Sequence, residues 1–145
     1  MVKTDNRSVG GRFEQELAEI LGQNGFWCHV MQQNKAGQPA DIIAVKGRFH
    51  TLIDCKVISD NKGFSTTEAR ENQRLAMKKF HSIGKEMCYF ALRLPDGNIY
   101  FLPFTVIYTV EHVLRQRVIS EKNIRECLPN LEKWLEDTNT WAEDI

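Results

Sequence analysis

Hydrophobic positions along the chain change period several times, and each change marks the boundary of an expected element. Apolar residues spaced three and four apart predict a first helix over residues 11–24, which ends at the Asn24-Gly25 pair. Residues 1–10 lack this pattern and are expected to be loose. Short runs rich in Ile, Val, Leu and aromatic residues predict strands. The expected strands are residues 26–31, 40–45, 50–58, 86–94 and 98–102.

A second helix is expected between the third and fourth strands. Ser65-Thr66-Thr67-Glu68 has the spacing of a capping box, so the helix is predicted to start there and to run to about Ser82. Its expected buried stripe consists of Ala69, Ala76, Phe80 and Ile83. Gln73 falls inside this stripe, and a core-facing amide needs hydrogen-bonding partners. A structural role and a role in a site are both open for it.

The last part of the chain predicts further helices, interrupted near Pro129. Leu131, Trp134 and Leu135 mark a short amphipathic helix that packs on the core or on a partner, and Trp141 has the same two options. The whole chain of 145 residues is expected to be a single domain. It would consist of a loose start, a core over 11–102 and a helical C-terminal extension over 103–145.

The second and third strands are expected to form a hairpin that places two aspartates opposite each other. A turn at Gly47-Arg48 pairs Lys46 with Phe49, and counting outward from this pair puts Asp41 opposite Asp54. A three-residue loop would shift the register by one. In the first register the Cβ atoms lie about 4.5–5.5 Å apart and the two charges repel. A divalent cation between the carboxylates would remove that repulsion.

The period of two along the third strand puts Lys56 on the same face as Asp54. Two carboxylates and an amine therefore converge on one side of the hairpin. By spacing alone, a metal site and a solvated, charged sheet face are about equally good interpretations. On the first helix Glu14 and Glu16 flank opposite edges of the apolar stripe, and the spacing does not choose between them.

The composition limits which kinds of binding partner and which cellular compartment are expected for the protein. The net charge is zero, which argues against a non-specific nucleic-acid coat and leaves any phosphate-binding face to local clusters of basic residues. The four cysteines are widely spaced without a CxxC motif, so free thiols in a reducing cytoplasm are expected and zinc ligation is not. No run is long and apolar enough for a membrane span, and the start lacks the apolar core of a signal peptide.

Four motifs in order give the chain a family resemblance. Gly10-Gly11-Arg12-Phe13-Glu14 is similar to the opening of the resolvases, in which a glutamate follows an aromatic residue. Pro39-Ala40-Asp41 resembles the first acidic motif of the PD-(D/E)xK nuclease superfamily, with Ala40 inserted at a variable position. Asp54-Cys55-Lys56 resembles its D/E-x-K motif, and Gln73 looks like a glutamine that some members carry. Within the superfamily, the set is most similar to the Holliday junction resolvases of the archaeal and RecU-like type.

The resemblance implies both a fold and an activity. The fold would be α/β, with a restriction-endonuclease-like αβββαβ core in which helices flank a mixed central sheet, followed by C-terminal helices. The activity would be that of a metal-dependent DNA endonuclease, a homodimer that makes paired nicks in four-way or other branched DNA. A repair or restriction nuclease of the same superfamily, and a non-catalytic nucleic-acid-binding module, are the alternatives.

The resemblance also implies roles for individual residues. Asp41, Asp54 and the main-chain carbonyl of Cys55 would hold Mg²⁺, or Mn²⁺ in its place, and Glu14 would reach the ion directly or through water. Lys56 would orient or activate the attacking water or neutralise developing charge, and Gln73 would position water or backbone. The candidates for phosphate contacts are Arg12, Lys46, Arg48, Lys62, Arg70 and Arg74.

Overall fold

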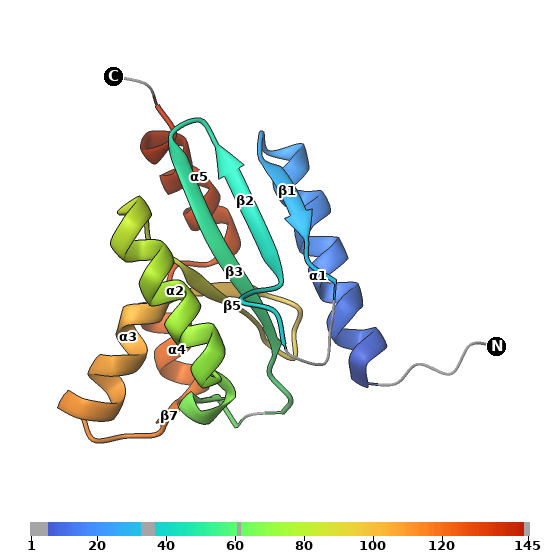
Figure 1. Cartoon of the computed structure of the whole chain (residues 1–145). Helices are drawn as coiled ribbons and strands as arrows, with labels where there is room; N and C mark the ends of the chain where they lie inside the picture. The colour runs from blue at the N-terminus through green and yellow to red at the C-terminus, as the bar shows by residue number, and fades with distance from the viewer. Residues whose placement is uncertain (1–5, 33–36, 61, 144–145) are drawn as a thin grey trace.

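A mixed five-stranded sheet forms the centre of the molecule (Figure 1). The structure, a computed structural model, describes residues 6–32, 37–60 and 62–143. The sheet has the order β1-β2-β3-β5-β6. These strands are β1 (Trp27–Val30), β2 (Ile42–Lys46), β3 (Phe49–Val57), β5 (Tyr89–Arg93) and β6 (Ile99–Pro103). Only the β3–β5 pair is parallel, because a helix connects these two strands.

Helices cover the two faces of the sheet and confirm the predicted αβββαβ order. The helices are α1 (Asn6–Gln23), α2 (Glu71–Gly84), α3 (Phe104–Tyr108), α4 (Glu121–Cys127) and α5 (Leu131–Trp141). A 3₁₀ turn, η1 (Thr66–Glu68), precedes α2, and a π-helical turn, η2 (Thr109–Val113), continues α3. A small antiparallel ribbon of β4 (Phe64–Ser65) and β7 (Val118–Ile119) lies outside the main sheet and was not predicted.

The sheet separates two hydrophobic layers. In one layer α1 and α5 pack on the sheet, with Phe13, Leu17 and Trp134 wholly buried. In the other layer α2, α3 and α4 contribute Met77, Ile107 and Ile124. The C-terminal helix α5 thus packs on the core: the Trp134 ring stacks on that of Phe101 with centroids 4.1 Å apart.

Two predicted helix starts are wrong. Helix α1 begins at Asn6 rather than at residue 11, so residues 6–10 are helical; the rest of the predicted loose start, residues 1–5, lies outside the described residues. Packing of Phe13 and Leu17 on the sheet fixes the helix, and extending a helix that is already formed avoids the cost of nucleation. Helix α2 begins at Glu71 rather than at Ser65, because pairing of Ser65 with Val118 holds that backbone extended.

The buried stripe of α2 also differs from its prediction. Met77 is wholly buried at its centre, whereas Ile83 is 73% exposed. Gln73 lies on the stripe as expected and is 9% exposed. The predicted stripe treated Ala69 as part of the helix. Because the helix begins after that residue, the positions that are buried differ from those predicted.

All four cysteines are free thiols. Burial raises the pKa of both Cys28 and Cys88 to about 11, which keeps these thiols protonated and unreactive. None of the helices in the described part of the chain is long and apolar enough to span a membrane.

Candidate active site

The hairpin register brings the two aspartates together as predicted. Lys46 pairs with Phe49 and Ile42 pairs with Ile53. Directly beyond this ladder the Asp41 N–H donates to the Ile53 carbonyl over 3.0 Å, and the side chains of Asp41 and Asp54 lie in contact. Gly47 has φ +55° in the turn, the left-handed conformation that a two-residue hairpin loop needs.

Asp54 is held by two side chains on the α2 face of the sheet. The Lys56 Nζ lies 3.0 Å from its Oδ2, and the Gln73 Nε2 donates to its Oδ1 over 3.0 Å. The Gln73 Oε1 accepts from the Arg70 N–H over 3.2 Å, so this side chain joins the start of α2 to the acid. Asp54 is only 1% exposed, and its Oδ2 accepts no hydrogen bond despite the nearby amine. This oxygen is ion-paired with Lys56 but, with two lone pairs, it can still bind a further cation.

Asp41 is fixed by the backbone of the other motif. The Cys55 N–H donates to its Oδ2 over 2.7 Å, which ties the first acidic motif to the D-x-K motif. The Gln38 Nε2 donates to its Oδ1 over 3.2 Å, and the Gln38 carbonyl accepts from Asn72 over 3.4 Å. Sequence reasoning missed Gln38, because it lies in a polar loop where no periodicity marks a buried residue.

The structure chooses between the two glutamates of the first helix. Glu14 is 8% exposed and its carboxyl group lies against that of Asp41. Glu16 instead forms an ion pair with Arg93 over 2.7 Å. Glu14 is therefore the helix acid of this site.

Three carboxyl groups share this site, and their electrostatics are unfavourable without a cation. Burial, followed by the charge of Asp41, raises the pKa of Asp54 to about 7, although Lys56 opposes the shift. The same two causes raise the pKa of Glu14 well above its usual range. Protons or a metal ion must therefore relieve the repulsion.

The donor set suits a hard divalent cation. Carboxylate and carbonyl oxygens are the ligands that Mg²⁺ prefers, and the ion keeps several waters. In the described part of the chain, no three His, Cys, Asp or Glu side chains already surround one point as metal ligands. The unbonded oxygen of Asp54 beside Asp41 thus fits a site with few protein ligands better than a closed cage.

The six candidate phosphate contacts lie in different places. Arg12, Lys62 and Arg70 are exposed, and Arg70 directly precedes α2 beside Gln73. Arg74 forms an ion pair with Glu111 over 2.6 Å. Lys46 donates to Asn139, and Arg48 lies in the turn at the far end of the hairpin. The structure therefore brings only part of this set near the acids.

Comparison with known proteins places these features in a family. The family model of the archaeal Holliday junction resolvases (Hjc) matches residues 5–136. The chain belongs to this family. The resolvase is thus a nuclease that acts on Holliday junctions, and branched DNA is its partner.

The fold of the resolvase has a solved counterpart. The structure of Hjc from Archaeoglobus fulgidus, a Holliday junction resolvase from an archaeal hyperthermophile, superposes with a TM-score of 0.61 at 23% sequence identity. The match covers 89% of this chain and 97% of that one, and at this identity it concerns the fold. A search of curated proteins found no match.

Proposed function

We propose that the resolvase cuts junction DNA by Mg²⁺-dependent phosphodiester hydrolysis at the Glu14, Asp41 and Asp54 cluster. One observation carries this proposal: a buried carboxylate with an unbonded oxygen lies beside two further acids and one amine. Three close carboxyl groups that share a single amine are costly without a further cation. Mn²⁺ has similar ligand preferences and would substitute.

Asp41, Asp54 and the Cys55 carbonyl would hold the ion, and Glu14 would contact it directly or through water. When bound, such an ion lowers the pKa of its water and stabilises charge on phosphoryl oxygens. The hydrogen bond from the Cys55 N–H fixes Asp41 relative to the strand that carries Asp54. The two acids are thereby held in one orientation before any ligand arrives.

Lys56 and Gln73 would act on the reacting groups. The Lys56 amine lies on the Asp54 side of the sheet, where it would orient the attacking water or offset the charge that develops on the phosphate. Gln73 bonds both Asp54 and, over 3.4 Å, Lys56, so it would hold the acid and the amine at a fixed separation.

The decisive variant is Asp54→Asn, with Glu16→Gln as the matched loss of one carboxylate outside the site. We expect Asp54→Asn to lower junction cleavage by about 10³-fold, because it removes a charged ligand for the ion. Glu16→Gln should cleave like the wild type. Thermal unfolding with and without Mg²⁺ gives a second readout: the ion should stabilise the wild type and the control but not Asp54→Asn. Undiminished cleavage by Asp54→Asn would overturn the assignment.

We further propose that two copies associate through the uncovered part of the α2 face. Paired cuts in a four-way junction need two sites related by a two-fold axis. In Figure 1, β1 and β2 lie beside α2 with no helix in front of them. An open groove of about 460 Å³ lies there, lined by apolar atoms of Met31, Ile43, Phe80 and Ile83. Trp27 extends the face, since it alternates with Cys28 of the α1 layer and is 62% exposed.

Ile83→Glu tests this interface, because it would bury a charge between the copies. We expect the molar mass in solution, from light scattering, to fall from that of a dimer to that of a monomer. Val113→Glu, an equally exposed apolar position on η2, is the control that should keep the dimer. A wild-type protein that is monomeric with and without junction DNA would contradict the proposal.

The free cysteines suit a reducing compartment, so we also propose a cytoplasmic location.

A further inference from the structure

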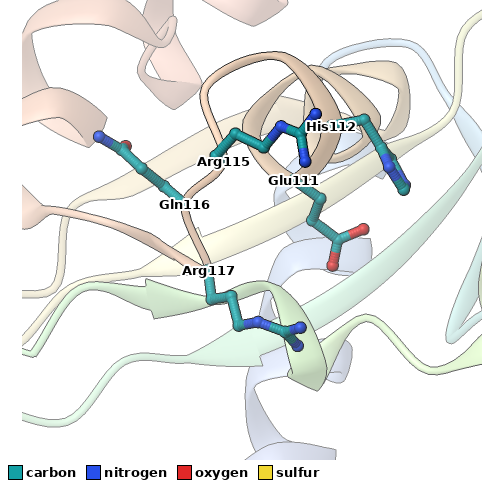
Figure 2. Close-up of a pocket in the computed structure, with 5 residues that line it drawn as sticks. All are labelled: Glu111, His112, Arg115, Gln116 and Arg117. Atoms are coloured by element: carbon teal, nitrogen blue, oxygen red, sulfur yellow. The ribbon is translucent and has the colours of Figure 1, made fainter.

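A basic hollow lies on the surface away from the acid cluster, where η2 passes into β7. It has a volume of about 400 Å³ (Figure 2). Its lining residues are Glu111, His112, Arg115, Gln116 and Arg117. Figure 2 shows Arg115 and Arg117 on the side of Glu111, whereas Gln116 points the other way.

The carboxylate of the hollow, Glu111, is already neutralised by Arg74 of α2. Arg74 donates two hydrogen bonds to the Glu111 carboxylate, over 2.6 and 3.0 Å. The same guanidinium donates to the Thr66 carbonyl over 2.6 Å, so it is fixed in place. Neither Arg115 nor Arg117 forms an ion pair with any acid that the structure describes, and both are exposed. The hollow therefore offers two free positive charges.

The backbone holds these two arginines in a fixed arrangement at a conformational cost. Arg115 has φ +56°, a left-handed conformation that costs an L-residue roughly 1–2 kcal/mol and that glycine would adopt freely. The preceding turn η2 is a π-helix, a rare form that is frequent at functional sites. The Arg117 carbonyl accepts from the Thr66 N–H over 2.8 Å, which ties it to the start of η1.

A short path of contacts joins the hollow to the acid cluster. Arg117 bonds Thr66, Thr66 bonds Arg74, and the neighbouring Gln73 bonds Asp54. The path consists of direct hydrogen bonds and one peptide link, so the hollow and the acids lie on neighbouring parts of the molecule. Exposed Arg70 lies beside Gln73 on this path, between the exposed acids Glu68 and Glu71.

We propose that Arg115 and Arg117 bind the phosphate backbone of the duplex arm that leads away from the cut. Duplex DNA carries a negative charge about every 1.7 Å of its axis, and two fixed guanidinium groups match such a row. The chain has no net charge, so its binding to a duplex arm depends on local clusters of basic residues such as this one. This inference rests on the proposed function, because the arm is that of the junction cut at the acid cluster.

The test is Arg115→Gln/Arg117→Gln, with Lys85→Gln/Lys133→Gln as a control that removes the same two charges elsewhere. The probe is a synthetic four-way DNA junction, bound in Ca²⁺ and followed by fluorescence anisotropy over a range of salt concentrations. Each lost phosphate contact lowers the slope of log K against log salt by about 0.9, so the slope should fall by about 2 in the patch variant. Binding near 0.1 M salt should weaken by about tenfold or more. The control should follow the wild type.

Arm length and cleavage rate separate this proposal from the proposed function. With arms cut back to the few base pairs beside the crossover, the patch variant and the wild type should bind equally. At saturating enzyme the patch variant should keep the wild-type single-turnover rate, unlike Asp54→Asn. Suppose that the wild type cleaves junctions and that the patch variant binds long-armed junctions with the same affinity and the same salt slope. The proposed contact with the arm would then be wrong. If the wild type cuts no junction, the proposed function fails instead.

Discussion

The two ends of the β2–β3 hairpin carry mainly charges of opposite sign, and they differ in how far other residues of the protein bind these charges. At the turn end, Lys46 donates to Asn139 and lies 5.3 Å from the centre of the Phe26 ring. At the open end, roughly 20 Å away by strand length, Asp41 and Asp54 are buried beside Glu14. The protein satisfies the turn end by itself, whereas at the open end a single amine, that of Lys56, faces three carboxyl groups. One hairpin thus joins a structural anchor to the proposed active site.

The turn end should carry more of the stability than any single residue at the open end. Phe49 and Trp134 pack there with ring centroids 6.0 Å apart. Trp134→Ala should lower the free energy of unfolding by about 3–5 kcal/mol, since it leaves a large cavity in the α1–α5 layer. Urea unfolding of the variant measures this loss. Trp141→Ala, at a ring that is 39% exposed, is the control and should lose clearly less. Equal losses would show that α5 is not anchored as described.

The open end should show its effects in activity. Lys56→Gln removes the only amine that lies against Asp54 in the described part of the chain. We expect a loss of about 10²–10³-fold in the single-turnover cleavage rate, the size of one electrostatic contribution to a transition state. Stabilisation by Mg²⁺ should persist, since both acids are kept. If the rate is unchanged while the ion still binds, Lys56 takes no part in the chemistry.

Substitution of Gln73 should have a smaller effect on the cleavage rate, one that separates a role in positioning Asp54 from a role in folding. Gln73→Ala removes the bond to Asp54 and the bond to the Arg70 N–H. We expect the single-turnover rate to fall about tenfold, roughly 1.4 kcal/mol, with junction affinity unchanged. Leu75→Ala on the exposed face of α2 is the control and should leave both values unaltered. A loss of affinity without a loss of rate would assign Gln73 to DNA contact instead.

The pH dependence of stability gives the finest comparison. The folded-state pKa of Asp54 is raised to about 7 and that of Glu14 is also raised, so the folded protein binds more protons than the unfolded chain. This stabilisation is complete below about pH 4 and is lost as pH rises through 7. Without metal, the melting temperature should fall by at least about 2–4 °C over this range, corresponding to 1 kcal/mol. Thermal scans should show a smaller decrease with Mg²⁺ and in Asp54→Asn; an unchanged decrease in both would mean that other groups cause it.

Local rules were enough to predict the centre of the site. A two-residue turn and a period of two fix which residues of a hairpin lie opposite, so the register from Lys46–Phe49 to Ile42–Ile53, and with it the closeness of Asp41 and Asp54, followed from counting. Lys56 followed from the same alternation. The helix that carries Gln73 was placed correctly in kind but not in its start, because the β4–β7 pairing across more than fifty residues holds Ser65 in a strand.

Contacts between distant segments decided the remainder. Spacing alone did not separate Glu14 from Glu16, since the choice depends on where Arg93 lies on another strand. Arg74 resembles a free phosphate contact in sequence, yet Glu111 from the C-terminal region engages it. Gln38 gave no signal because its burial depends on the neighbouring α2.

The sequence by itself determined the order of the main helices and strands, the hairpin register and the nearness of the two aspartates, because turn geometry and side-chain alternation act between near neighbours. Only the tertiary structure decided which charges are satisfied and which are left free. A charged side chain is paired or hydrogen-bonded by whatever the fold brings within a few ångströms: Arg93 and Glu111 form ion pairs, Asn139 accepts a hydrogen bond, and each is remote in sequence from its partner. The same rule leaves three carboxyl groups of the open end with a single amine, and for that reason we propose that end as the active site.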